Sequence, residues 1–117
     1  AQMGKYTGQT KYYDDAITLY GRILALKPDW EWAYNNRGTA YKSKGQYEQA
    51  ISDYNKAIEI NPRHASAYFY KALSCEKMGH TWEAIKAYNG FIQYASPQYA
   101  SYIEHARQRI RELEKNE

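Results

Sequence analysis

The sequence predicts an all-α fold built from stacked antiparallel helix pairs. Two stretches of equal length, residues 31–64 and 65–98, align with each other at an offset of 34 residues. The aligned positions are small, aliphatic or aromatic: Tyr34 with Tyr68, Gly45 with Gly79, Ala50 with Ala84, Ile51 with Ile85, and Tyr54 with Tyr88. Within each stretch these residues recur at helical spacing, which indicates apolar stripes on helices.

A glycine and a proline mark the helix ends in the first of these units. Gly45 follows two lysines, and glycine adopts at little cost the left-handed conformation that closes a helix. Pro62 ends the second helix, because proline cannot continue the hydrogen-bond ladder and disfavours a helical residue before it. Each unit is therefore predicted as a helix, a tight turn and a second helix.

The order of small and aromatic residues in this unit resembles the tetratricopeptide repeat. The residues that carry the resemblance are Tyr34, Gly38, Tyr41, Ala50, Tyr54, Ala57 and Pro62. Arg37 departs from the pattern, at a position where the family usually has Leu. The resemblance implies a right-handed superhelical solenoid of antiparallel helix pairs, in which the first helix of each pair lines a concave groove.

The same offset divides the chain, as a single domain, into four parts. Residues 1–30 are predicted as a truncated first repeat, with a helix over residues 12–26, because four residues match repeat positions: Tyr13, Ala16, Tyr20 and Pro28. Residues 31–64 and 65–98 are the second and third repeats. Residues 99–117 are predicted as one amphipathic helix with an apolar stripe and a solvated face. The resemblance implies that this helix caps the stack, covering the apolar side of the last repeat and keeping its charged face in solvent. Since the chain begins without Met, we expect a fragment of a longer protein or a processed product.

The first helix of each pair supplies the candidate peptide-binding residues, because the resemblance places it along the groove. The candidates differ between units at positions expected to face the groove: Trp32, Asn35, Asn36, Thr39, Lys42, Ser66, Phe69, Tyr70, Leu73, Glu76, Lys77, Ile103 and Arg107. Trp32 and Phe69 are predicted as aromatic anchors, although packing against a neighbouring helix would also account for them. The amides of Asn35 and Asn36 fit either the main chain of a bound peptide or solvent.

The carboxylate clamp with which members of this family hold the acidic C-terminus of a chaperone is not predicted. Its Lys, Arg and Asn side chains come from three successive repeats. If the truncated unit counts as the first repeat, Asn36 matches the central Asn. However, Ala1 and Lys5 occupy two clamp positions, and Ser66 and Tyr70 occupy the other two. We therefore expect a ligand with apolar anchors.

One column of basic residues has two interpretations. Arg37, Lys71 and His105 recur at the repeat offset. They form either a basic track on one surface or long side chains whose stems lie along apolar neighbours.

Composition limits the other classes of function. A formal net charge of +3 is too small to indicate nucleic-acid binding, so an RNA-binding helical repeat is only a second alternative. We predict no enzyme, metal site or cofactor, because Cys75 stands alone and the three His residues lack ligand spacing. No apolar run reaches transmembrane length, so membrane insertion is not expected. The single Cys and the lack of a signal-peptide pattern favour the cytoplasm as a default location.

The prediction for function is a protein-protein interaction module, a scaffold or adaptor that binds a peptide segment of a partner protein. The first alternative is self-association into a homo-oligomer through the N-terminal edge. It rests on the apolar stripe of the helix over residues 12–26, because part of the helix expected to cover it is missing.

Overall fold

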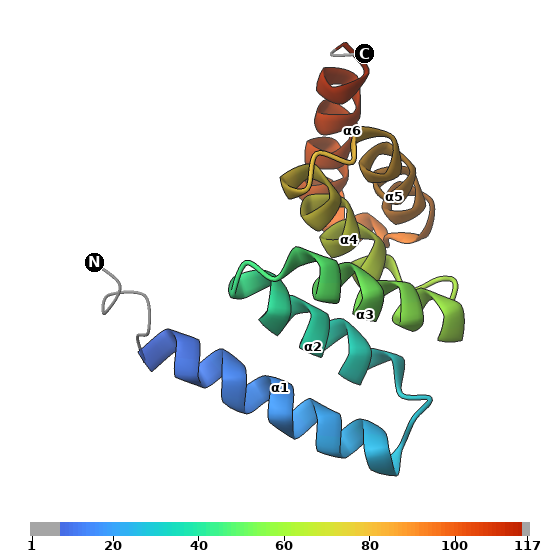
Figure 1. Ribbon diagram of the computed structural model, residues 1–117. Helices are drawn as coiled ribbons and strands as arrows, with labels where there is room; N and C mark the ends of the chain where they lie inside the picture. Colours follow the sequence, from blue (N-terminus) through green and yellow to red (C-terminus); the bar gives the residue numbers. More distant parts are fainter. Residues whose placement is uncertain (1–7, 116–117) are drawn as a thin grey trace, which may run out of the picture.

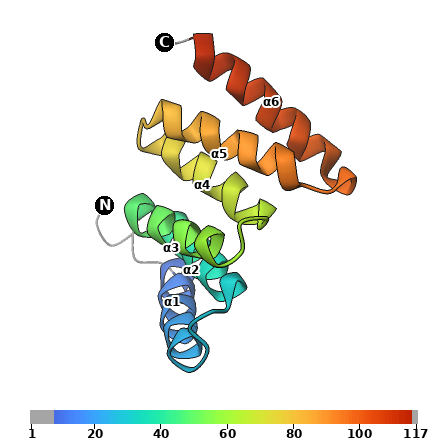
Figure 2. The same cartoon turned by 90° about the vertical axis from the view of Figure 1, so that its right-hand side faces the viewer.

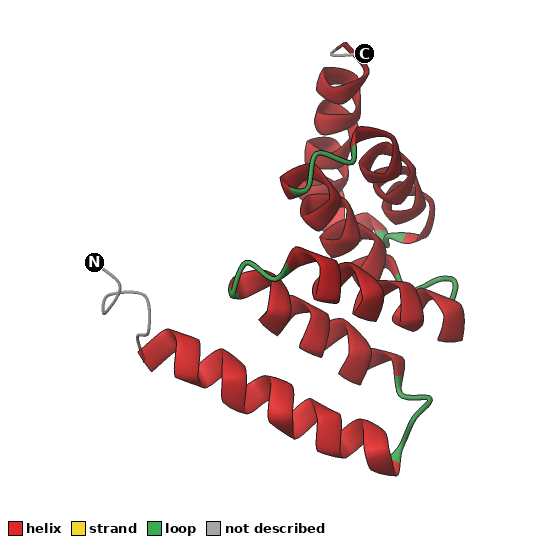
Figure 3. Cartoon of the chain, in the orientation of Figure 1, coloured by secondary structure: helices red, strands yellow, loops and turns green. Residues whose placement is uncertain are grey.

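The computed structural model describes residues 8–115, which form a stack of six α-helices (Figures 1 and 2). The helices are α1 (Gly8–Leu26), α2 (Glu31–Ser43), α3 (Tyr47–Ile60), α4 (Ala65–Lys77), α5 (Thr81–Tyr94) and α6 (Ala100–Lys115), with a 3₁₀-helix η2 (Pro97–Tyr99) before α6. Short loops join successive helices (Figure 3). The predicted all-α solenoid of antiparallel helix pairs is confirmed.

The two full repeats turn between their helices in the same way. Gly45 and Gly79 have φ angles of 81° and 77°, in the left-handed region that favours glycine. In each turn the following amide donates back into the first helix, from Gln46 to the carbonyl of Tyr41 and from His80 to that of Cys75, both at 2.9 Å. These are the glycine-closed helix ends that the sequence predicted.

Helix α1 begins earlier than the sequence indicated. The expected break near Lys11 is absent, and the helix runs without interruption from Gly8 to Leu26. Lys11 occupies the repeat position of Gly45 and Gly79. Because it lacks their freedom at positive φ, no left-handed turn forms there and the helix continues. The part of the first repeat expected before Gly8 lies outside the described residues.

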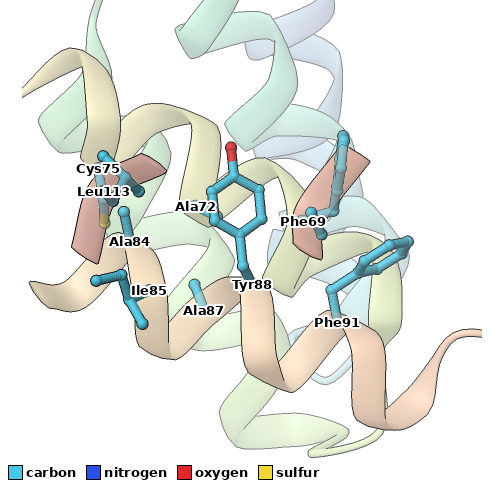
Figure 4. Packing of buried hydrophobic residues seen from close by; sticks show 10 residues of the cluster. Phe69, Ala72, Cys75, Ala84, Ile85, Ala87, Tyr88, Phe91 and Leu113 are labelled. Carbon is cyan, nitrogen blue, oxygen red and sulfur yellow. The ribbon is translucent and has the colours of Figure 1, made fainter. Parts of the chain in front are cut away.

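The core consists of two clusters of buried residues. The larger one joins α4, α5 and α6, and Figure 4 shows its members: Phe69, Ala72, Cys75, Ala84, Ile85, Ala87, Tyr88, Phe91, Ala106 and Leu113. The smaller one joins α3 to α4 through Ala50, Tyr54, Ala57 and Ala67. The many alanines let helix backbones approach closely, while the rings fill the remaining space.

Two glycines inside helices mark the closest approaches between elements. A Cβ atom added to Gly38 in α2 would lie 3.0 Å from the Tyr54 ring and 3.2 Å from the carbonyl oxygen of Ala50. A Cβ atom on Gly90 in α5 would lie 2.4 Å from the Tyr68 ring. The glycines therefore make room for tyrosine rings, which accounts for Gly90 despite its cost of about 1 kcal/mol to a helix interior.

Candidate functional site

Two cavities lie along the row formed by α2, α4 and α6. The first has a volume of about 490 Å³, and we call it the aromatic cavity because seven aromatic side chains line it: Trp32, Phe69, Tyr70, Phe91, Tyr94, Tyr99 and Tyr102. The second has a volume of about 310 Å³, and we call it the cationic pocket. Its lining consists of Lys42, Tyr47, Leu73, Glu76, Lys77, His105 and Arg109. Residues of α2, α4 and α6 line both cavities, as expected for a groove in this fold, and the aromatic cavity is also lined by α5 and by the segments that precede α4 and α6.

Phe69 forms part of the wall of the aromatic cavity but is largely a core residue. Its side chain is only 8% exposed. Its ring centroid lies 4.9 Å from that of Phe91 and 5.5 Å from that of Tyr102 (Figure 4 shows Phe69 beside Phe91). Packing against neighbouring helices therefore accounts for Phe69 better than the free anchor that the sequence also allowed.

Trp32 lies over a buried histidine at the edge of the aromatic cavity. The Trp32 side chain is 49% exposed, and its ring centroid is 4.2 Å from that of His64. His64 caps α4, because its Nδ1 atom accepts from the Ala67 amide at 3.3 Å. Burial lowers the pKa of His64, and the nearby charge of Glu31 only partly offsets this effect. The ring is therefore neutral near pH 7, with its proton on Nε2.

The amide of Asn35 is buried in a polar network instead of facing a ligand. Asn35 is 3% exposed, and its Oδ1 atom accepts from the Ser66 hydroxyl at 3.4 Å. Its Nδ2 atom donates to Oδ1 of Asn36 at 3.3 Å. The Thr39 hydroxyl donates to the Asn35 carbonyl at 3.1 Å and lies 3.0 Å from the Tyr54 hydroxyl. These bonds connect α2 to α3 and α4, and of the two amides only Asn36 keeps a partly exposed side chain.

The cationic pocket contains one carboxylate that is already paired. Glu76 accepts hydrogen bonds from Arg109 of α6, with Nε at 3.2 Å, and from the Tyr88 hydroxyl of α5. Burial alone would raise the pKa of Glu76, but the hydrogen bonds from Arg109 and Tyr88 hold it below its ordinary value. Glu76 therefore joins α4, α5 and α6. Because Arg109 neutralises its charge, Glu76 should repel an acidic ligand only weakly.

Two lysines in the cationic pocket have no carboxylate partner. Neither Lys42 nor Lys77 forms an ion pair with any residue between 8 and 115. The Lys42 ammonium lies 5.6 Å from the ring centroid of Tyr70, within cation-π range. Because Tyr70 also lines the aromatic cavity, it connects the two cavities.

The remaining candidates contribute less to either cavity. Leu73 lines the cationic pocket and packs against the larger core cluster. Ile103 from α6 packs against the same cluster but lines neither cavity. Arg107 is exposed and lines neither cavity.

The basic residues at the repeat offset, Arg37, Lys71 and His105, do not all have the same surroundings. Arg37 forms a two-bonded ion pair with Asp53, with both distances 2.8 Å. The hydrogen bond to Asp53 raises the pKa of Arg37. His105 instead lines the cationic pocket, so Arg37 and His105 do not belong to one common basic track.

Several cavity residues were missing from the sequence-based set. The ones on the aromatic cavity are Asn61, Arg63, His64, Ala65, Phe91, Tyr94, Ser96, Tyr99 and Tyr102, and those on the cationic pocket are Tyr47, His105 and Arg109. One signal was available for Tyr102, which lies one repeat offset after Tyr68. The loop residues and the end of α5 have no such repeat relation to an earlier tyrosine. They also lie outside the first helices, which the family resemblance places along the groove.

Residues 8–115 show neither a metal-ligand cluster nor a membrane-spanning helix. In that range no three His, Cys, Asp or Glu side chains are grouped so that they could hold a metal ion. Over the same residues, no helix has the length and apolar character required to cross a membrane. Cys75 is buried, and burial raises the pKa of its thiol.

Solved structures similar to this chain contain the same helix arrangement. The Sgt2 TPR domain of Aspergillus fumigatus is 28% identical, with a TM-score of 0.74 over 90% of this chain and 72% of that one. The type III secretion chaperone SycD of Yersinia enterocolitica, in complex with a peptide of the translocator YopD, is 18% identical, with a TM-score of 0.86 over 93% and 86%. The TPR2B domain of yeast Sti1, in its pHsp70 complex, is 22% identical, with a TM-score of 0.80 over 92% of this chain and 86% of that one.

Sequence comparison identifies the repeat itself. A search of curated proteins returns no significant match. Two family models described as tetratricopeptide repeat match residues 31–64 and 53–86. The first match coincides with the unit from Glu31 to His64 that the period of the sequence defined, and the two matches together show tetratricopeptide-repeat sequence over residues 31–86 of this chain.

Proposed function

We propose that this chain is a non-catalytic interaction module that binds a peptide segment of a partner protein along α2, α4 and α6. The observation that carries the proposal is the aromatic cavity, with the half-exposed Trp32 at its edge and Tyr70 connecting it to the cationic pocket. Exposed aromatic residues around a preformed hollow are typical of interface hot spots. The peptide complex of the similar SycD structure supports this use of the fold.

The chemistry of the two cavities defines the ligand. An apolar side chain of the partner enters the aromatic cavity, and an acidic residue lies near the unpaired Lys42 and Lys77. Phe69 and Lys77 are eight residues apart on α4, a distance of ~12 Å at the rise of an α-helix. An extended peptide covers this distance with about four residues. The preferred motif is therefore an apolar residue and an acidic residue about four positions apart.

This mode differs from the carboxylate clamp. Ser66 and Tyr70 occupy clamp positions that require Lys and Arg, and the Ser66 hydroxyl is bonded to Asn35. Two further clamp positions, Ala1 and Lys5, lie outside the described residues. Lys42 and Lys77 are at other positions of the repeat, so a carboxylate held there belongs to a side chain of the ligand.

A peptide library selected against the chain tests the proposal. Trp32→Ala should weaken the selected peptides about 30-fold, which corresponds to ~2 kcal/mol for an aromatic anchor. Trp82→Ala is the matched control, because Trp82 is 63% exposed but lines neither cavity. Circular dichroism should show both variants folded.

The same selection tests the charge of the ligand. Lys42→Gln combined with Lys77→Gln should weaken peptides that carry an acidic residue and reduce the salt dependence of binding. Lys86→Gln, at an exposed position on α5, is the control. Peptides that bind the Trp32 and lysine variants as tightly as the parent chain would refute the proposed site.

A further inference from the structure

Helix α1 presents an exposed apolar seam on the side away from α2. It lies at the end of the stack, with α2 on one side (Figures 1 and 2). Tyr12, Leu19 and Leu26 are 69%, 54% and 89% exposed. By contrast, Leu24 is buried, and a Cβ atom added to Gly21 would lie 4.0 Å from the Arg37 side chain of α2. The three exposed residues thus belong to a different face from the one that packs in this chain.

The spacing on this face is that of a coiled-coil seam. Tyr12, Leu19 and Leu26 are each seven residues apart, and Ala16 and Ile23 lie between them at the alternate heptad position. Ala16 and Ile23 are partly exposed. Apolar residues at both positions over 15 residues form the narrow stripe through which one helix pairs with another. Isolated surface leucines would not share a heptad.

The charges beside the seam are self-complementary in one orientation. Asp15 and Arg22 are also seven residues apart, so they follow the seam along the same side. Asp15 is 68% exposed and its ion pair with Lys11 is equally exposed, so it remains accessible to a second charge. A two-fold axis through Leu19, perpendicular to the helix, brings Asp15 of each copy beside Arg22 of the other. The same axis places Tyr12 against Leu26 of the second copy. A parallel pair would not bring these charges together.

We infer that α1 is the homodimer interface of this chain and that its occupant is the α1 helix of a second copy, packed antiparallel about Leu19. Such an interface is isologous, because the same residues contribute from both copies. It does not use the aromatic cavity or the cationic pocket, so the inference is independent of the proposed peptide-binding function.

The test measures the mass of the full chain in solution over a rising concentration series, by light scattering and sedimentation. The parent chain should pass from monomer to dimer, and Leu19→Glu should stay monomeric. Trp82→Glu is the control, since it places the same charge on an equally exposed apolar residue away from α1 and should dimerise like the parent. All variants are first shown to be folded by circular dichroism.

A charge-exchange experiment tests the orientation. Asp15→Arg alone and Arg22→Asp alone should each weaken dimerisation about tenfold, because two attractive pairs become repulsive. Mixing the two variants should restore the dimer, since each Arg then faces an Asp of the other chain.

The inference is overturned by a parent chain that remains a monomer throughout the series, or by a dimer that survives Leu19→Glu. It is also overturned if the mixture of charge variants associates no better than either variant alone. A peptide that still binds the Leu19→Glu variant would show that the groove and this interface act separately.

Discussion

The two full repeats share a backbone but are held together by different interactions. Asn35 and Phe69 occupy the same repeat position and are both buried, at 3% and 8% exposed. In the repeat over residues 31–64 this position carries an amide with hydrogen bonds to Asn36 and Ser66. In the repeat over residues 65–98 it carries a ring that packs against other rings. One repeat is thus joined largely by directional polar bonds and the other largely by apolar burial.

The equivalent tyrosines differ in a second way, because their hydroxyls have different partners. Both Tyr54 and Tyr88 are fully buried, and burial raises the pKa of each hydroxyl well above its ordinary value. The Tyr54 hydroxyl is bonded to Thr39, whereas that of Tyr88 donates to Glu76, which Arg109 also binds. The period of a repeat therefore sets where a ring lies, while residues outside the period decide what holds it.

The largest expected effect distinguishes the two repeats at that shared position. Phe69→Ala should lower the free energy of unfolding by about 3–5 kcal/mol, because it removes a buried ring and leaves a cavity. Asn35→Ala should cost only about 1–2 kcal/mol, the penalty for hydrogen-bond partners left unsatisfied. Urea denaturation followed by circular dichroism measures both. Equal losses would contradict the distinction between an apolar and a polar repeat.

The ion pair of the polar repeat should have the next largest effect. Asp53→Ala should cost about 2–3 kcal/mol, below the range for a fully buried pair, because the Arg37 side chain is 24% exposed and water can partly replace the carboxylate. Glu59→Ala removes an exposed pair with Lys56 and should cost under about 0.5 kcal/mol. A similar loss in both variants would show that the Arg37 to Asp53 pair is no stronger than a surface pair.

Alanine at three helical glycines compares the close contacts of the repeats with an open position. Gly38→Ala and Gly90→Ala should each cost about 1–2 kcal/mol, because the added methyl groups collide with Tyr54 and Tyr68. Gly21→Ala should instead stabilise the chain by about 0.5–1 kcal/mol, since the added methyl group would lie 4.0 Å from the Arg37 side chain and alanine favours helix. Thermal unfolding gives the order. A stabilising Gly90→Ala would mean that Tyr68 moves aside without cost.

The smallest effect concerns the histidine cap where the two repeats meet. Because burial holds the pKa of His64 below the ordinary value of 6.5, the folded chain binds this proton more weakly than the unfolded chain. The neutral His64 cap contributes fully to the free energy of unfolding at pH values above the ordinary pKa of 6.5. This contribution is lost as pH falls through the lower pKa of the folded state, because the protonated Nδ1 atom no longer accepts from the Ala67 amide. The change should be about 1 kcal/mol, typical of a cap.

His64→Asn provides the control for this pH dependence. Asparagine caps a helix without titrating, so the variant should show a flatter dependence of the urea midpoint on pH. A pH profile identical to that of the parent would exclude His64 as its source.

The sequence was sufficient for the parts of the fold that repeat. The turns and helix ends could be located from Gly45, Gly79 and Pro62. The backbone conformations that glycine and proline favour depend on the residue itself and not on distant contacts. The sequence was insufficient where the identity of a residue depends on a contact with a residue far away in the chain. Nothing local connects Gly90 with Tyr68, and Lys11 was not recognised as the missing turn glycine.

The site was only partly predictable for the same reason. Trp32 and Tyr70 were found on first helices, but Tyr94 and Tyr99 reach the aromatic cavity from a helix end and a connecting segment. Their contribution depends on how α5 and α6 are packed, which the repeat period does not encode. Phe69 and Asn35 lie on the expected helices yet are buried, because residues on neighbouring helices cover them.

The buried thiol of Cys75 allows the opening rate of one repeat to be measured on the unmodified chain. Cys75 is the only cysteine, is 1% exposed and lies among the side chains of α4, α5 and α6. A thiol reagent can therefore react only when the apolar repeat opens, and the labelling rate follows the frequency of that opening. The polar repeat contributes no such signal. Labelling kinetics on the unmodified chain thus report whether the last repeat and its capping helix open before the rest of the stack.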